Sequence, residues 1–148
     1  MKPSTRQKES IVERIGPFRI VSPIARGGMG RVYLAEHEKD GRRVAVKVLP
    51  EEFLADKKRS QYLEREMKIA KNLSHPNVVK IFGLHRRQGV GYLIMEYLDG
   101  GNLRRHIRDQ DLGLAGTLGI ILKICEGLHY IHNHKLEDGR FHSIIHRD

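Results

Sequence analysis

Apolar and polar residues alternate along five stretches in the first two thirds of the chain, which predicts β-strands. The expected strands cover residues 18–25, 31–37, 42–49, 78–84 and 90–97. Pro23 favours an edge position for the first strand, because proline cannot donate a hydrogen bond to a sheet ladder. The glycine-rich run at 27–30 and the run Lys39–Gly41 are turn signals, so the first three strands are expected to be joined by hairpins.

A different period appears between the third and fourth strands. Leu63, Met67, Ala70 and Leu73 recur at three- and four-residue spacing, which predicts a helix over 60–73, with Glu64 and Lys68 paired on its outer face. A second, short helix through residue 108 is expected, with Asn102 as its cap. A longer helix over 114–132 follows, and then a polar loop at 133–143. Residues 1–15 are expected to be a disordered lead-in.

The predicted fold class is α+β: a five-stranded, mostly antiparallel sheet with one helix inserted after the third strand, followed by helices. With 39% apolar and 30% charged residues among 148, the composition is typical of a soluble globular protein. The single cysteine, Cys125, excludes an internal disulfide. No signal peptide is expected, and the longest uncharged stretch, 112–122, is too short to cross a bilayer. We therefore expect a cytoplasmic protein without a membrane segment.

The net charge of +9 makes nucleic acid a possible partner. The basic residues are scattered in twos and threes, and no aromatic residues interleave with them as stacking platforms. Solvated surface charge is therefore favoured over a specific nucleic-acid site. Five histidines near the end of the chain raise the alternative of a metal site, but no cysteine pair accompanies them, so no metal ligand is assigned. These histidines are His129, His132, His134, His142 and His146.

Lys47 ends the strand-forming run at 44–47 and is expected at the inner edge of the sheet. A lysine in that position is costly unless an anion meets it. Phosphates held by the glycine-rich run at 27–30 are one candidate, and the carboxylate of Glu66 on the predicted helix is another. Each feature alone has an ordinary explanation: a hairpin turn, a lysine that blunts a sheet edge, and a solvated helix residue.

The succession of these features resembles the bacterial serine/threonine protein kinases of the eukaryotic-like type, and the resemblance covers residues 16–148. It rests on five runs in order: IARGGMGRVYLA (24–35) is similar to the family's nucleotide loop, VAVK (44–47) to its β3 lysine motif, LEREMKIAKNLSHPNVV (63–79) to its αC helix, MEYLDGGNL (95–103) to its hinge, and IIHRD (144–148) to the start of its catalytic loop. The resemblance implies a kinase N-lobe and hinge over 16–98 and part of a C-lobe over 99–148.

The same resemblance implies ATP and Mg²⁺ as cofactors and a protein serine or threonine as substrate. Lys47 is expected to bind the α- and β-phosphates and to form an ion pair with Glu66, and Met95 to lie behind the adenine. Asp148 is expected to orient the substrate hydroxyl. The implied nucleotide-binding residues are Ile24, Ala25, Gly27, Gly28 and Gly30 in the loop, Val32 and Ala45 above the adenine ring, Lys47, Met95, the backbone of Glu96 and Leu98, and Asn102 near the ribose.

Three departures from the family pattern stand out. Ala25 occupies the position of the usual first glycine, and the loop at 133–143 is longer than usual. The sequence also ends at Asp148, so the family's magnesium ligands would lie beyond it and the polypeptide as written is expected to be an inefficient kinase. A non-catalytic nucleotide-binding or interaction module is the alternative. Rapid amide hydrogen exchange is expected across 112–148, because the apolar face of the 114–132 helix lacks its usual partners.

Overall fold

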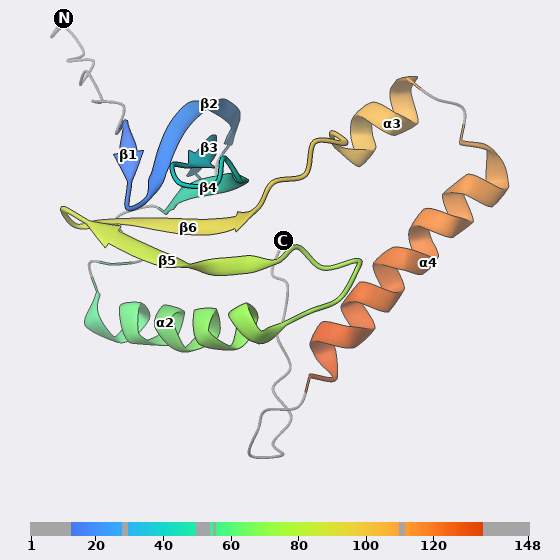
Figure 1. Cartoon of the computed structure of the whole chain (residues 1–148). Helices are drawn as coiled ribbons and strands as arrows, with labels where there is room; N and C mark the ends of the chain where they lie inside the picture. The colour runs from blue at the N-terminus through green and yellow to red at the C-terminus, as the bar shows by residue number, and fades with distance from the viewer. Residues whose placement is uncertain (1–12, 28–29, 50–53, 55, 110–111, 135–148) are drawn as a thin grey trace, which may run out of the picture.

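The computed structural model describes residues 13–27, 30–49, 54, 56–109 and 112–134. The described residues form one β-sheet with strands of different lengths, a helix beside the sheet, and two helices that follow the sheet in the chain (Figure 1). The elements are β1 (Arg14–Ile15), β2 (Phe18–Gly27), β3 (Gly30–His37), β4 (Arg43–Leu49), α2 (Lys57–Asn72), β5 (Ile81–Arg87), β6 (Val90–Glu96), α3 (Leu103–Asp109) and α4 (Gly113–His132). The α+β class expected from the sequence is confirmed.

The sheet has six strands in the order β1-β2-β3-β4-β6-β5, and every neighbouring pair is antiparallel. The sixth strand is β1, which falls within the lead-in expected at 1–15, so that prediction was wrong for Arg14 and Ile15. Ile15 is 2% exposed and lies in the main apolar cluster. Burial of one large aliphatic side chain therefore outweighs the polar character of its neighbours. Residues 1–12 lie outside the described residues.

The fourth predicted strand is displaced from its expected position, whereas the fifth, predicted at 90–97, is confirmed as β6 (Val90–Glu96). The prediction placed the fourth strand at 78–84, whereas β5 runs over Ile81–Arg87. Gln88 and Gly89 both have positive φ, at 50° and 79°, and Arg87 pairs with Val90. This is the geometry of a two-residue hairpin turn, and such a turn fixes the register of the strands that flank it.

The two faces of the sheet have different contents. The main apolar cluster lies on one face, where successive strands contribute alternate residues; its members are Ile15, Phe18, Ala35, Val44, Val46, Tyr92 and Ile94. The intervening residues of β3, β4 and β6 point to the opposite face, because side chains along a strand alternate. This second face carries Lys47, and we call it the lysine face. The fold is therefore stabilised largely from the side that Lys47 does not occupy.

Helix α2 lies along β5, at the edge of the sheet (Figure 1). It begins three residues before the predicted helix, and its apolar stripe ends in the buried Ala70 and Leu73. Ser60 lies near its first turn and is 7% exposed, the one buried polar side chain among the described residues. The contact of α2 with the sheet is thus made chiefly through β5.

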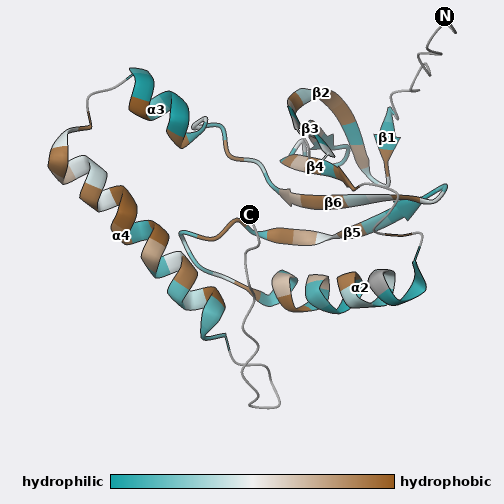
Figure 2. Ribbon diagram, turned by 180° about the vertical axis from the view of Figure 1, so that it is seen from behind, coloured by the Kyte–Doolittle hydropathy of each residue, from teal (hydrophilic) through white to brown (hydrophobic). Residues whose placement is uncertain are grey.

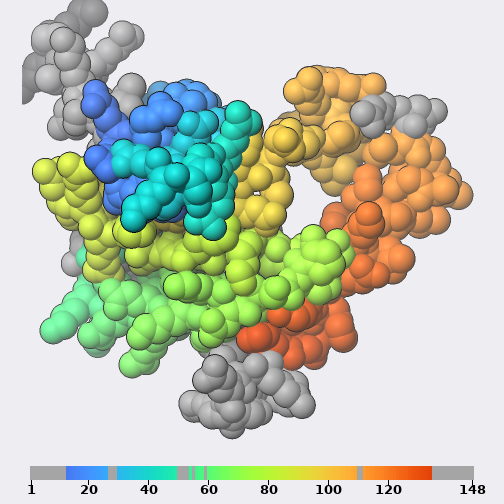
Figure 3. Space-filling view, in the orientation of Figure 1, coloured from blue at the N-terminus to red at the C-terminus, as the bar shows by residue number. Residues whose placement is uncertain are grey.

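Helices α3 and α4 follow a linker at the end of β6, and α3 is capped as predicted. The side-chain Oδ1 of Asn102 accepts a hydrogen bond from the Arg105 N–H at 2.9 Å. Helix α4 stands apart from the sheet over most of its length (Figure 3). Apolar residues recur along it (Figure 2). The side chains of Leu114, Leu118 and Leu122 are 77%, 56% and 61% exposed.

The C-terminal half of α4 contacts the loop between α2 and β5. Tyr130 Oη accepts a hydrogen bond from the Ser74 N–H at 3.0 Å, and the Asn77 amide donates to Glu126 Oε2 at 3.0 Å. The Tyr130 ring also stacks on His75, with ring centres 4.9 Å apart. By length and composition α4 is also the one described helix that could cross a membrane, which by itself is weak support for a span. The polar contacts at its end instead indicate packing against the loop.

Candidate functional site

The predicted nucleotide-binding residues of the sheet share the lysine face. Val32 pairs with Lys47 across β3 and β4, and Ala45 pairs with Met95 across β4 and β6. Ala25 pairs with Val32 from the other side. Because paired residues of an antiparallel ladder project to the same face, these side chains form a single surface. Val32, Lys47 and Met95 are half-buried, and Ala45 is buried. The structure therefore brings together the apolar wall and the lysine that the sequence suggested. Ile24, by contrast, is an exposed residue near the end of β2.

The tip of the β2–β3 hairpin approaches the neighbouring strand closely. Gly27 ends β2 and pairs with Gly30, which begins β3. Gly30 has a φ of +116°, and a β-carbon built on it would lie 2.5 Å from the backbone oxygen of Val48. Only glycine tolerates both the conformation and the contact. The hairpin thus holds bare backbone next to the end of β4 that carries Lys47. Gly28, also predicted here, lies outside the described residues.

The expected ion pair between Lys47 and Glu66 is not formed. Over the described part of the chain, no hydrogen bond or ion pair joins these two side chains, although both are half-buried. The physical reason is the position of α2, which packs on β5, two strands away from β4 in the sheet order. The prediction rested on the spacing of motifs along the chain, and that spacing does not fix where the helix lies across the sheet.

A pair of contacts that the sequence analysis missed holds the N-terminal half of α2. Arg86 on β5 donates from Nη2 to Ser60 Oγ at 2.5 Å and forms an ion pair with Glu64 Oε1 at 2.7 Å. Glu64 was expected to pair with Lys68, but among the described residues the structure records no contact between them. The one sequence signal was a serine within the apolar period of the helix, because such a residue needs a polar partner when buried.

The linker after β6 positions the predicted hinge residues. The Glu96 N–H donates to the Lys80 carbonyl at 2.8 Å, so the group that Glu96 could offer an adenine edge is its carbonyl. Leu98 is 63% exposed. The Oδ1 of Asn102 is engaged as the α3 cap, which leaves its NH₂ group for a ribose hydroxyl. Glu96 ends β6, and Leu98 and Asn102 lie in the linker that leads from β6 to α3.

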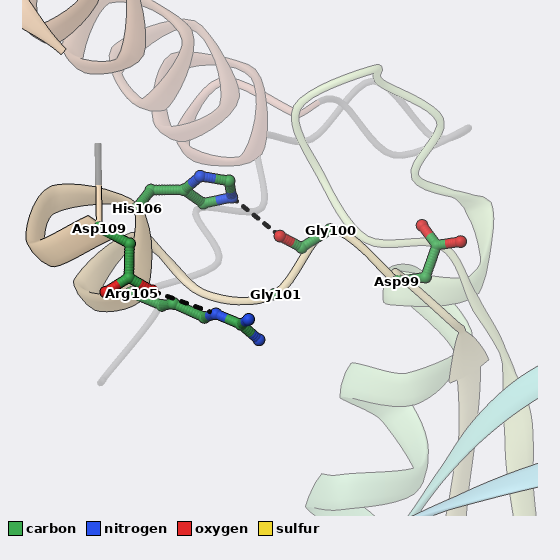
Figure 4. Close-up of a pocket in the computed structure, with 6 residues that line it drawn as sticks. All are labelled: Asp99, Gly100, Gly101, Arg105, His106 and Asp109. Carbon is green, nitrogen blue, oxygen red and sulfur yellow. Dashed lines mark hydrogen bonds and ion pairs between the residues drawn. The ribbon is translucent and has the colours of Figure 1, made fainter. Parts of the chain in front are cut away.

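A cavity of about 370 Å³ adjoins this linker at α3 (Figure 4). His106 Nε2 lies 2.8 Å from the Gly100 carbonyl oxygen, and Arg105 Nε lies 3.3 Å from Asp109 Oδ2. Asp109 also accepts hydrogen bonds from Arg108, and chiefly for this reason its pKa lies below its ordinary value. The basic side chains that line the cavity, Arg105 and His106, therefore contact other residues of the same segment. None of the predicted nucleotide-binding residues lines it. The remaining lining residues are Asp99 and Gly101.

Metal ligands are not brought together in the part of the chain that the structure describes. No group of three or more histidine, cysteine, aspartate or glutamate side chains there is arranged to hold a metal ion. The structure describes three of the five histidines: His129, His132 and His134. The ring of His134 lies near that of Tyr130, which also stacks on His75. His142, His146 and the predicted catalytic Asp148 lie outside the described residues.

Known proteins are similar to this chain in sequence and in fold. Residues 18–148 match the protein kinase domain family. Serine/threonine-protein kinase Pkn1 of Myxococcus xanthus is 35% identical over 91% of this chain and 18% of that protein, and PrkC of Bacillus subtilis is 32% identical over 90% and 19%. Mouse aurora kinase C is 34% identical over 100% of this chain and 50% of that protein. The crystal structure of the Mycobacterium tuberculosis PknI kinase domain superposes with a TM-score of 0.68 at 24% identity, over 85% of this chain and 54% of that one.

The family match and the fold agree with the arrangement of the predicted nucleotide-binding residues on the lysine face. The chain spans about a fifth of the bacterial relatives that it matches and about half of the solved kinase domain. The bare backbone at Gly30, the lysine on the next strand and the hinge after β6 occur in the order that the matched family uses. The chain belongs to the protein kinase domain family.

Proposed function

We propose that this chain is the nucleotide-binding part of a serine/threonine protein kinase domain, which binds ATP with Mg²⁺ and transfers the γ-phosphoryl group to a protein hydroxyl. The observation that carries the proposal is the lysine face, where Val32 and Lys47 are paired across β3 and β4. Kinship with named serine/threonine kinases supports the reaction and the class of substrate. A cytoplasmic location is part of the proposal.

The residues on the page fit a nucleotide. Val32, Ala45 and Met95 supply an apolar surface suited to a purine, and Lys47 supplies a positive charge at its edge. The glycine hairpin supplies backbone without side chains beside the end of β4. N–H groups of such a backbone can approach phosphate oxygens closely. Mg²⁺, when bound with ATP, neutralises phosphate charge. No magnesium ligand is assigned among the described residues.

The test compares nucleotide binding by the native chain and by two lysine variants. Binding is measured by calorimetry and by the rise in the unfolding temperature when nucleotide is added. Lys47→Met is expected to weaken ATP binding by about tenfold or more, as loss of one charge-assisted contact implies. Lys68→Met is the matched control, because Lys68 is an exposed lysine on α2. Equal affinities for the native chain and Lys47→Met would contradict the proposal. Chelation of Mg²⁺ is expected to weaken binding in the native chain.

A second function, nucleotide binding without phosphoryl transfer, is favoured by the separation of Lys47 from Glu66 on α2. Transfer of labelled phosphate from ATP to a general protein substrate, measured in the complete kinase domain of which this chain is proposed to be part, distinguishes the two. Transfer that is abolished by Asp148→Asn supports the kinase reaction. Tight ATP binding without transfer supports the second function.

A further inference from the structure

The outward face of α2 carries basic and amide side chains and no acidic one. Successive helical residues are about 100° apart, so residues that are separate in the sequence fall within one sector of about 100° around the axis. We call this sector the α2 strip; its members are Lys57, Lys58, Gln61, Arg65, Lys68 and Asn72. All of them are exposed, and α2 lies beyond β5 at the edge of the molecule (Figure 1). The helix thus gathers basic residues that are scattered along the chain.

The basic residues of the α2 strip differ from those of the sheet and of α3, because they have no carboxylate partner. Among the described residues, no ion pair involves any of them. On the sheet, by contrast, Arg19 forms an ion pair with Glu36 at 2.8 Å. On α3, Arg105 forms one with Asp109 at 3.3 Å. The charges of the α2 strip are therefore available to an anion from another molecule.

The two acidic residues of α2 do not cancel the charge of the strip. Glu64 borders the strip beside Lys68, but its carboxylate forms an ion pair with Arg86 of β5 at 2.7 Å. Glu66 lies outside the sector and is half-buried. The side chain of Arg86 is 40% exposed, so it extends the positive surface from α2 onto β5.

We propose that the α2 strip binds the sugar-phosphate backbone of double-stranded nucleic acid, independently of base sequence. Lysine, arginine, asparagine and glutamine are side chains that contact phosphate oxygens in such complexes, and the strip contains these types alone. It has no aromatic residue on which the bases of a single strand could stack. The net charge of +9 attracts a polyanion from a distance. The site is separate from the proposed nucleotide site and does not depend on it.

The composition of the strip argues against a protein or a membrane as its partner. Protein interfaces are anchored by aromatic and apolar side chains and are depleted in lysine, whereas the strip has no apolar member. A helix that binds a membrane surface inserts its apolar face among the lipid headgroups. The apolar stripe of α2 is not free to do so, because it packs toward the sheet and ends in the buried Ala70 and Leu73.

The experiment follows binding of the native chain to a fluorescent duplex of mixed sequence by anisotropy, as the salt concentration is raised. Each phosphate contact contributes about −0.9 to the slope of log affinity against log salt. One contact from each of the four basic residues gives a slope of about −3.6, a loss of affinity on the order of 100-fold between about 50 and 200 mM salt. A slope weaker than about −2, or no binding at the lowest salt, contradicts the proposal.

Two double variants with the same change of net charge locate the contact. Lys58→Gln/Arg65→Gln is expected to weaken the slope by about 1.8, because two phosphate contacts are lost. Arg104→Gln/Lys123→Gln removes one arginine and one lysine from exposed positions of α3 and α4, and is expected to retain the native slope. Glutamine is a good helix former, so both variants are expected to fold. Equal losses in the two variants would show that net charge alone drives binding, and the strip would then have no role.

Three further comparisons identify the ligand and the surface. A second duplex of the same length and another sequence is expected to bind within about threefold, and a preference of about tenfold or more overturns sequence independence. Vesicles that contain phosphatidylserine, and polyglutamate, are expected to bind more weakly than the duplex at equal salt; tighter binding of either one refutes the choice of partner. Lys47→Met is expected to bind the duplex as the native chain does. Loss of duplex binding in Lys47→Met would assign the phosphates to the lysine face instead of the α2 strip.

Discussion

A β-carbon on Gly30 would lie 2.5 Å from the backbone oxygen of Val48, at the point where the β2–β3 hairpin crosses the end of β4. Gly30→Ala is therefore expected to displace the hairpin tip, at a cost of roughly 1–3 kcal/mol in the free energy of unfolding. Nucleotide affinity is expected to fall about tenfold. Urea unfolding and calorimetry provide the two measurements. Gly41→Ala is the control: it has a φ of +69° but open space around it. Equal losses in both variants would mean that backbone conformation, not the contact with Val48, sets the cost.

The two-residue strand β1 is expected to carry more stability than its length suggests. Ile15 is 2% exposed in the main apolar cluster, so Ile15→Ala is expected to lower the free energy of unfolding by about 2–5 kcal/mol. Val21→Ala, at a side chain that is 43% exposed, is expected to change it by about 0.5 kcal/mol or less. The midpoint of urea unfolding measures both. A native-like midpoint for Ile15→Ala would show that β1 is dispensable.

Two glycines of α4 are expected to respond in opposite directions to the same substitution. A β-carbon on Gly127 would lie 2.8 Å from the Asn77 carbonyl oxygen, so Gly127→Ala is expected to separate α4 from the loop before β5. Gly119 has open space, and Gly119→Ala is expected to stabilise the helix by about 1 kcal/mol. Hydrogen exchange at the Ser74 amide, which donates to Tyr130, reports on the contact. Slow exchange at Ser74 in Gly127→Ala would contradict this docking.

The carboxyl group of Asp109 is expected to titrate below its ordinary range. Hydrogen bonds from Arg108, and secondarily from Arg105, favour the charged form and lower its pKa. Because the pKa of Asp109 is lower in the folded than in the unfolded chain, its carboxylate stabilises α3 at pH values above the unfolded pKa. This stabilisation is lost as the pH falls through the folded pKa. Arg108→Gln is expected to raise the pKa, as followed by carbon NMR of the carboxyl. Arg104→Gln is the control on the same helix, and an unmoved pKa in Arg108→Gln would contradict the assignment.

The sequence predicted the parts of the structure that short-range patterns determine. The hairpins, the inserted helix and the Asn102 cap follow from periodicity and turn chemistry within a few residues. The placement of α2 across the sheet could not be predicted this way, because it depends on Arg86 reaching Ser60 over 26 residues of chain. The same limit applies to Ile15, whose burial depends on strands formed later in the sequence. Local pattern identified the residues of the site, and long-range contacts decided which of them meet.

The division of the sheet into a packed face and a lysine face has an evolutionary consequence. Val44 and Val46, on the packed face, are 0% exposed, whereas Lys47, the next residue along the strand, points to the other side. Substitutions at Val44 and Val46 are therefore selected mainly for folding, and those at half-buried positions of the lysine face, such as Lys47, mainly for what the protein binds. A lineage could lose or exchange its ligand through the second set while keeping the fold intact. Descendants with the same architecture and a silent site would remain well folded.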